Sequence, residues 1–370
     1  MSARSHVVVV GAGPGGLAAA ARLAERGGRA VRVTLLAPGG TATFLAGTLD
    51  VMLAEADPGA FRVAVKIPGV EVLDARAEAV SATEVVLTRG TLAADAVIAA
   101  PGLAVRGRTT LPAWSRAVWA WDPVGAAVAR SAMGEPSGGR VLVAACGLPY
   151  RCPPAPFALA VGLAERYRRA RRLTGVTALT PEMMPLAGVG GEAPALVMEA
   201  AAAAGVSVER AFQVDLAASE DGVLRSGDGR ELRYEAAFLV PPHERAACLA
   251  GLPGDGPLVE VGDCGRVGEE TLFVIGDAAA SGLPRAAGVA RCLAAAAADA
   301  ALQDLGLAEA PPPEPVQASC FMFHHGGALS RIRVTYLGGE PRVEIDGPSL
   351  DLIPARAGEH RRFLREAGGR

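Results

Sequence analysis

The chain has 370 residues, of which 51% are hydrophobic and 20% charged, and it carries a formal net charge of −3. This length suffices for two or three domains with sizeable hydrophobic cores, and the mildly acidic balance gives no basis for binding nucleic acid. Six cysteines do not make the disulfide framework of a small secreted protein. No signal peptide or transmembrane segment is evident, so we expect a cytoplasmic protein.

The first predicted strand, over residues 7–10, leads directly into the glycine pattern G-x-G-x-x-G and then into an alanine-rich helix over residues 17–25. This order of strand, glycine turn and helix is typical of a dinucleotide-binding site. Gly11 permits the tight turn, Gly13 lets the backbone approach a pyrophosphate, and Gly16 allows helix and strand to pack closely. The helix N-terminus would then face the phosphates with free N–H groups.

The second strand is predicted over residues 31–36. Dinucleotide sites usually have Asp or Glu at the end of this strand to bind a ribose hydroxyl, but this chain has Ala37 there, followed by Pro-Gly-Gly. Backbone groups can make that contact instead. Residues 95–102 read as a further strand that ends at Gly102.

A second α/β unit begins with a strand that ends at residue 145. Its further strands are predicted over residues 176–180, 206–211 and 236–242, and an Asp-Gly pair at 228–229 predicts a hairpin. The glycine fingerprint is absent from this unit, because the strand is followed by a turn with prolines at 153, 154 and 156. Proline has no N–H to donate to a phosphate, so we do not expect a nicotinamide dinucleotide there.

A later strand, within residues 271–280, ends in Gly276 and Asp277, and a helical segment follows over residues 286–302. A carboxylate at this place can accept a hydrogen bond from a ribitol hydroxyl, while the helix end points at the flavin. The glycine turn, the strand before Gly102 and this Gly-Asp pair occur in the order typical of two-dinucleotide-domain flavoproteins. We therefore predict FAD as the cofactor and assign no metal site.

These elements predict an α/β fold with two Rossmann-like FAD/NAD(P)-binding domains and a short C-terminal α+β region. We expect the FAD domain to consist of residues 1–105 and 256–310, on either side of a second Rossmann-like domain over 106–255. A proline-rich linker at 311–315 opens the C-terminal region, 311–370, in which strands are predicted over 332–336 and 341–345 and a short helix from about residue 357.

Four segments carry a family resemblance. They read Tyr-Arg-Cys-Pro-Pro-Ala-Pro at 150–156, Leu-Val-Pro-Pro-His at 239–243, Gly-Asp through Leu-Pro-Arg-Ala-Ala-Gly at 276–288, and Ala-Ser-Cys-Phe-Met-Phe at 318–323. Together they resemble the sulfide:quinone oxidoreductase and flavocytochrome c sulfide dehydrogenase flavoproteins. The resemblance covers nearly the whole chain, and its most specific part is the Cys-Pro-Pro-Ala-Pro segment combined with the late cysteine.

The resemblance implies that Cys152 and Cys320 face each other at the flavin as a redox disulfide. It also implies a small sulfur substrate, such as sulfide, and a quinone or a protein as electron acceptor. Sulfide that attacks the disulfide leaves a persulfide on one cysteine and a thiolate on the other, and a nearby helix end or cation would lower the pKa of that thiolate. Cys146 is either an alternative partner of Cys152 or ordinary core. We interpret Cys248, Cys264 and Cys292 as structural or incidental.

The chain departs from the family pattern in three places. Ala158 stands where members often have a glutamate as proton acceptor, and Arg285 replaces the usual lysine near the flavin. No cysteine occurs in residues 41–50, where the flavocytochrome type attaches FAD covalently, so we expect FAD to be bound non-covalently. His324 and His325, close to Cys320, could replace the missing base or could simply be polar loop residues.

Two other functions stay open: an NAD(P)H-dependent flavin oxidoreductase of the same fold, and a non-catalytic flavin-binding electron-transfer subunit. A basic C-terminal stub, residues 359–366, leaves open a peripheral contact with the inner face of the membrane, and the sequence also leaves open a homo-oligomer. The arginines of residues 166–172 are interpreted as solvated cations at the C-terminal end of a helix.

Overall fold

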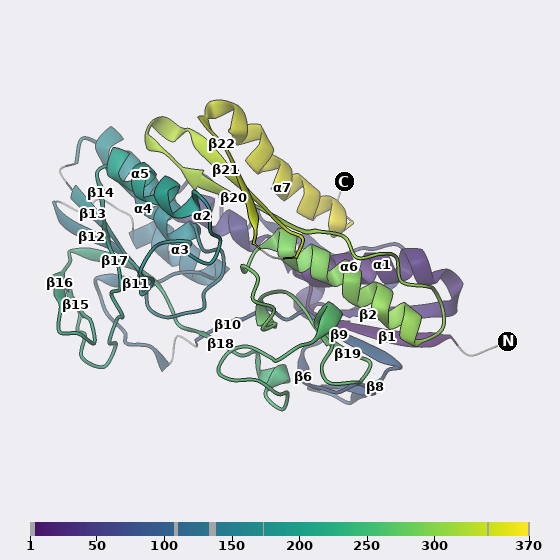
Figure 1. Ribbon diagram of the computed structural model, residues 1–370. Helices are drawn as coiled ribbons and strands as arrows, with labels where there is room; N and C mark the ends of the chain where they lie inside the picture. The colour runs from purple at the N-terminus through teal and green to yellow at the C-terminus, as the bar shows by residue number, and fades with distance from the viewer. Residues whose placement is uncertain (1–3, 107–109, 133–137, 173, 339, 369–370) are drawn as a thin grey trace.

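The computed structural model describes residues 4–106, 110–132, 138–172, 174–338 and 340–368, and its two largest sheets each contain five parallel strands (Figure 1). The strands of the first sheet are, in spatial order, β19 (Leu272–Val274), β9 (Ala96–Ala99), β1 (Ser5–Val10), β2 (Val31–Leu36) and β5 (Val70–Leu73). Valines 7–10 of β1 are at most 5% exposed, as expected of a parallel strand that is covered on both faces. Two segments far apart in the sequence therefore share this sheet.

Two helices, α1 (Pro14–Gly27) and α6 (Ala287–Asp304), lie side by side on one face of the first sheet (Figure 1). Their small residues allow close contact, and Arg22 of α1 forms an ion pair with the buried Asp299 of α6 at 2.7 Å. The other face packs against a small antiparallel sheet of β6 (Ala77–Val80), β7 (Glu84–Leu87) and β8 (Thr91–Ala93).

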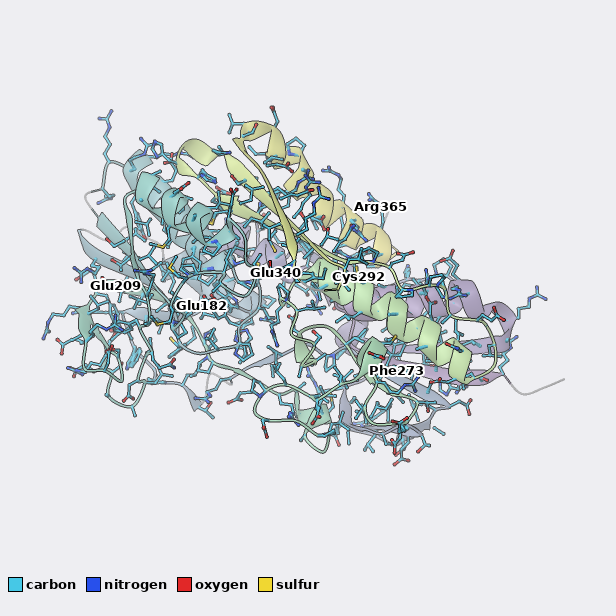
Figure 2. All side chains as sticks on the ribbon, in the orientation of Figure 1. Glu182, Glu209, Phe273, Cys292, Glu340 and Arg365 are labelled. Atoms are coloured by element: carbon cyan, nitrogen blue, oxygen red, sulfur yellow. The ribbon has the colours of Figure 1, made fainter. Side chains whose placement is uncertain are left out.

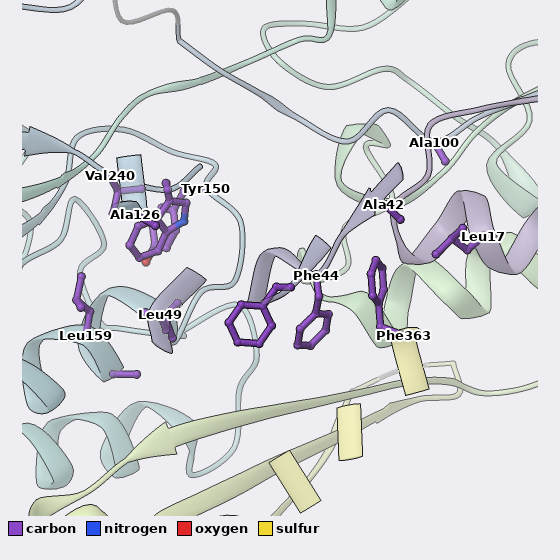
Figure 3. Close-up of a cluster of buried hydrophobic side chains, with 14 of the residues drawn as sticks. Leu17, Ala42, Phe44, Leu49, Ala100, Ala126, Tyr150, Leu159, Val240 and Phe363 are labelled. Atoms are coloured by element: carbon purple, nitrogen blue, oxygen red, sulfur yellow. The ribbon is translucent and has the colours of Figure 1, made fainter. Parts of the chain in front are cut away.

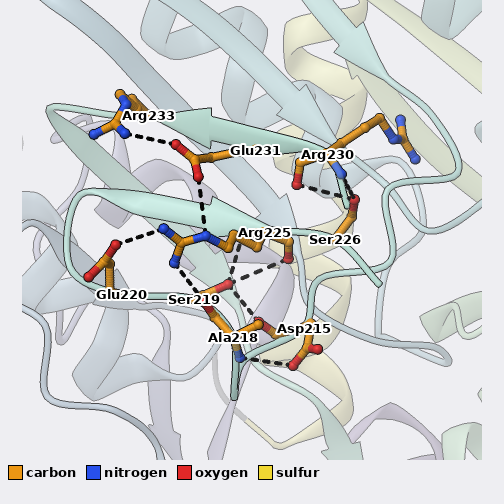
Figure 4. Close-up of polar contacts among 9 residues, drawn as sticks. All are labelled: Asp215, Ala218, Ser219, Glu220, Arg225, Ser226, Arg230, Glu231 and Arg233. Carbon is orange, nitrogen blue, oxygen red and sulfur yellow. Dashed lines mark hydrogen bonds and ion pairs between the residues drawn. The ribbon is translucent and has the colours of Figure 1, made fainter. Parts of the chain in front are cut away.

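The second sheet has the spatial order β11 (Ala117–Trp119), β17 (Ala236–Val240), β12 (Gly139–Ala145), β13 (Thr174–Leu179) and β14 (Val206–Glu209). It packs against α3 (Pro123–Ala132), α4 (Ala155–Arg169) and α5 (Ala193–Ala203). The Asp-Gly pair at 228–229 does form the predicted hairpin, between β15 (Val223–Arg225) and β16 (Glu231–Arg233). Figure 4 shows how Arg225 ties this hairpin together, with ion pairs to Glu220 at 2.8 Å and Glu231 at 3.2 Å.

The C-terminal region is an antiparallel sheet followed by a helix. Its elements are β20 (Val316–Phe323), β21 (Leu329–Tyr336), β22 (Arg342–Ser349) and α7 (Ile353–Glu366). β20 packs against both α6 and α4, so it joins the two halves of the molecule. The helix α7 is anchored by Phe363, whose fully buried ring lies 5.4 Å from that of Phe44 (Figure 3).

The remaining elements are short: β3 (Thr41–Thr43), α2 (Thr48–Met52), β4 (Arg62–Ala64), β10 (Ala104–Val105) and β18 (His243–Glu244). The predicted fold class, α/β with two Rossmann-like units and a C-terminal α+β region, is confirmed. The residue boundaries predicted for the domains stay predictions. Within the described parts of the chain, no helix combines the length and hydropathy needed to cross a membrane.

Candidate functional site

The glycine turn lies where β1 ends and α1 begins. Gly11 has a φ of +98°, which glycine adopts without strain. A Cβ at Gly16 would lie 1.7 Å from the Gly11 carbonyl oxygen, so only glycine allows this approach of helix and strand. At Gly13, by contrast, no described atom lies within 4 Å of an ideal Cβ. The space in front of the α1 N-terminus is therefore open, as a phosphate site requires.

A carboxylate that sequence reasoning missed lies at the same sheet edge. The N–H of Ala37, at the end of β2, donates to the Leu73 carbonyl of β5 at 3.0 Å. Asp74 comes next, and its Oδ1 accepts a hydrogen bond from the Gly39 N–H at 2.5 Å. The pairing of β2 with β5 thus brings an exposed acid beside Ala37, although β2 itself ends without one.

Asp277 follows β19 in a short turn, Gly276–Ala278, next to the N-terminal end of α6. Burial raises the pKa of its carboxyl, and the positive charges of Arg151 and Arg285 oppose that shift. Arg285 donates from Nη1 to the Leu283 carbonyl at 3.2 Å, while its buried Nε has no partner among the described residues. The sequence did not single out Arg151. Burial lowers the pKa of its guanidinium, the negative charge of Asp277 opposes that shift, and the guanidinium donates a hydrogen bond to the Trp121 carbonyl.

Cys152 lies between the second sheet and residues 276–288, the segment predicted to contact the flavin. Its N–H donates to the Arg285 carbonyl at 3.1 Å, and its own carbonyl accepts from Ala155 in the first turn of α4. Its φ of +56° is rare for a residue with a side chain. The loop that holds this cysteine is thus fixed directly to the segment that contains Arg285.

Cys320 lies in the middle of β20 and faces the Cys152 loop. Burial, and after it the negative charge of a Cys152 thiolate, raises the pKa of the Cys320 thiol. A small apolar pocket of about 20 Å³, roughly the size of one water molecule, borders Cys320. Its other lining residues are Pro153, Pro154, Leu186, Val189, Pro284, Ala286, Ala318, Ile332 and Val334. The structure therefore brings the two predicted cysteines together, both as free thiols.

Burial opposes the lowering of the thiol pKa that nearby cations were expected to produce. Burial raises the pKa of Cys152 to about 11, and the charge of Asp277 adds to that shift. Arg356 and Arg151 act in the opposite direction but more weakly. Burial raises the pKa of Cys320 further still. Cations do lie next to the site, as expected, but they lower the thiol pKa by less than desolvation raises it.

The other cysteines lie away from this pair. Cys146 is 4% exposed and packs into the cluster on the hairpin side of the second sheet, whereas Cys152 packs against the cluster on the α4 side. Cys248 is buried, Cys264 is exposed, and Cys292 is half-buried on α6 (Figure 2).

The position of the missing glutamate is closed, because Ala158 is fully buried on α4. His325 forms an ion pair with Glu165 at 3.1 Å, and burial lowers the pKa of His324. A carboxylate lies on the other side of the cysteine loop instead: Glu182 accepts a hydrogen bond from the Tyr150 hydroxyl at 2.9 Å. The charge of Cys152 also acts on Tyr150.

These features fit a flavin dinucleotide. The open space at Gly13, the positive φ of +70° at Gly102 with no described atom near its Cβ position, and the unpartnered Arg285 Nε all leave room or donors for one. Asp277 provides a carboxylate at the end of β19. The predicted residues Gly11, Gly16 and Gly276 form the turns around this space.

Comparison with solved structures shows the same fold. The sulfide:quinone oxidoreductase of the hyperthermophilic bacterium Aquifex aeolicus superposes with a TM-score of 0.82 at 17% identity, covering 98% of this chain and 91% of that one. A chain of the Tetrahymena thermophila mitochondrial ATP synthase gives 0.75 at 14% identity, covering 100% and 95%. Putidaredoxin reductase, from its covalent complex with putidaredoxin, gives 0.65 at 15%, covering 99% and 94%.

No curated protein sequence matches the chain significantly. The family model described as an FAD binding domain matches residues 6–236, more than half of the chain, and includes the glycine turn and the Cys152 loop. The chain therefore belongs to the FAD-binding domain family, and FAD is its cofactor.

Proposed function

We propose that this protein is an FAD-dependent oxidoreductase that oxidises sulfide, or a related sulfur species, through a redox disulfide between Cys152 and Cys320. The observation that carries the proposal is the position of the pair. Cys152 is hydrogen-bonded to the backbone of Arg285, and Cys320 borders a cavity that also contains Pro284 and Ala286 of the same flavin segment. Two cysteines 168 positions apart in the sequence thus meet beside the residues expected to hold the flavin.

The order of attack follows from the two environments. Cys320, and not Cys152, borders the small apolar pocket. The positive charges of Arg356 and Arg151 favour the thiolate of Cys152, so Cys152 is the better leaving group. Hydrosulfide attacks the Cys320 sulfur, the bond between the two cysteines breaks, and a persulfide forms on Cys320 while Cys152 leaves as the thiolate. Atoms and charge balance in this step.

Gly11, Gly13, Gly16, Gly102, Gly276, Asp277 and Arg285 are the residues that would hold FAD. We expect the binding to be non-covalent, because residues 41–50 contain no cysteine. FAD supplies a two-electron acceptor beside the dithiol and a donor for the final acceptor, which we propose to be a quinone or a protein. Arg285 places a fixed positive charge next to Asp277 in this region.

A proton must leave the sulfur substrate, and Ala158 cannot accept it. We assign this role to Glu182, acting through the Tyr150 hydroxyl, since this pair lies within electrostatic range of Cys152. Thr180 also donates to Glu182 at 3.0 Å, which fixes the carboxylate in place. His324 and His325 lie on the other side of α4 from this pair, next to Glu165.

The test is an anaerobic titration of the purified yellow protein, first with sulfide and then with NADH, followed by flavin absorbance. Sulfide should bleach the flavin of the parent protein and of Cys264→Ser, whose exposed thiol serves as the control. Cys152→Ser and Cys320→Ser should resist sulfide, while dithionite still reduces the flavin of both. Rapid bleaching by NADH with no response to sulfide would favour an NAD(P)H-dependent reductase and overturn the proposal.

A further inference from the structure

A large cavity lies behind the cysteine pair, between the C-terminal end of α4, the turn joining β20 to β21, and the beginning of α7. Its volume is about 920 Å³, which is in the range of sites for small organic molecules. The described residues of the glycine turn, Asp277 and Arg285 do not line it. Nothing proposed above uses this space.

The cavity is strongly cationic. Five arginines and two glutamates are among its described lining residues, which gives the lining a formal net charge of +3; the arginines are Arg130, Arg166, Arg169, Arg172 and Arg356. Glu165 accepts hydrogen bonds from Arg168 and Arg169, which hold its pKa at about 2, while burial raises the pKa of Glu55. Arg166 donates only to a neutral carbonyl, that of Leu53, at 3.2 Å. The arginines of residues 166–172 are therefore not merely solvated helix-end cations, because Arg166 forms part of a cavity wall.

Two buried polar groups in the same lining lack partners. Tyr167 is 3% exposed, and its hydroxyl has no hydrogen-bond partner in the described part of the chain. The same is true of Nε2 of His324, on the opposite wall. Buried polar groups of folded proteins are nearly always satisfied, and these two atoms, which have almost no exposed surface, are exceptions.

One part of the wall is apolar. It contains Phe323, Leu329, Leu350 and Ile353, and two of these are exposed large side chains, Leu350 at 59% and Ile353 at 48%. Such a wall suits a ligand that has an apolar body as well as a charge. A bare inorganic anion would leave this wall unused.

We propose that this cavity binds an organic oxyanion, a molecule with a carboxylate or phosphate group on an apolar body. The oxyanion lies against Arg166 and Arg130, and the body packs on Phe323 and Ile353. Arg356 lines the same cavity, stacks over the Phe323 ring at 5.0 Å and forms an ion pair with Asp50 at 2.7 Å.

The test uses the FAD-loaded full chain and isothermal titration with 2-naphthyl phosphate, 2-naphthoate, neutral 2-naphthol and inorganic phosphate. At least one of the two naphthyl anions should bind about tenfold or more tightly than 2-naphthol, and its binding should weaken as salt rises from about 0.05 M to about 0.5 M. Inorganic phosphate should bind more weakly than that anion, because it buries no apolar area. Comparison of the ester with the carboxylate shows which oxyanion the site prefers.

One matched pair of variants locates the binding. Arg166→Gln should weaken it about tenfold or more, whereas Arg171→Gln, just beyond the same helix and outside the lining, should not. Equal binding of naphthol and the naphthyl anions, no binding of any probe, or equal effects of the two substitutions would overturn the proposal. Since no sulfide is used, its failure is distinguishable from failure of the proposed function.

Discussion

Alanine substitutions at Gly13 and Gly16 separate cofactor binding from folding. Gly13 has φ −78° and ψ −179°, an extended conformation that alanine adopts freely, and its Cβ would enter a space with no described atom within 4 Å. Gly13→Ala should therefore leave the stability of the FAD-free protein unchanged, or raise it by about 0.4–1 kcal/mol through the unfolded state. The same methyl group would occupy the space into which we place the pyrophosphate.

The expected loss of FAD affinity in Gly13→Ala is about 1–3 kcal/mol, or about tenfold to hundredfold, as for other overpacked sites. Gly16→Ala should behave differently, because its Cβ would lie 1.7 Å from the Gly11 carbonyl oxygen and the two backbones must move apart. We expect it to cost about 4 kcal/mol or more in the free energy of unfolding. Unfolding in urea without FAD and fluorescence titration with FAD measure the two quantities separately. Parent-like FAD affinity in Gly13→Ala would refute the placement of the pyrophosphate.

Three further predictions concern single side chains. Asp74→Asn should weaken FAD binding severalfold, because we expect the second carboxylate oxygen of Asp74 to accept a hydrogen bond from the ribose. The control Glu71→Gln, close to it in the chain, should leave FAD binding unchanged. Equal FAD affinities of the two variants in a titration would remove Asp74 from the site. Asp277→Ala should reduce FAD occupancy after purification more than Arg285→Ala does, since an unpaired buried hydroxyl costs about 1–3 kcal/mol, and the reverse order would contradict the assignment. In reduced protein burial raises the pKa of Cys152 from 9.0 to about 11, so the thiol's contribution to stability is complete below about pH 9 and is lost as the pH rises toward 11. The free energy of unfolding should therefore fall between about pH 9 and about pH 11 relative to that of Cys152→Ser. Parallel curves for the two proteins would show that the pKa is not raised.

Much of the flavin site could be predicted from the sequence because it is built from local patterns. The glycine turn and the Gly276-Asp277 pair each combine a strand, a turn and a helix within a few residues, and the structure has both. Asp74 could not be found in this way, because its place beside Ala37 depends on the pairing of β2 with β5. Arg151 was missed for a similar reason. It follows a strand of the second sheet, whereas Asp277, with which it interacts electrostatically, follows a strand of the first.

The cysteines illustrate a different limit. The proximity of Cys152 and Cys320 came from family resemblance, because no spacing rule relates positions so far apart. The sequence does not show on which face of the second sheet Cys146 lies. In the structure it packs into the cluster on the hairpin side, whereas Cys152 packs against the cluster on the α4 side. The nearby arginines lower the pKa of the Cys152 thiol as expected, but burial, which is not visible in a sequence, outweighs them.

The central claim is the pairing of Cys152 with Cys320, and peptide mass mapping of the oxidised protein under non-reducing conditions tests it most directly. We predict a single bridge between peptides containing these two cysteines, with Cys146 recovered as a free thiol. A bridge between Cys146 and Cys152, or free thiols at both Cys152 and Cys320 in protein whose flavin sulfide still reduces, would contradict the account.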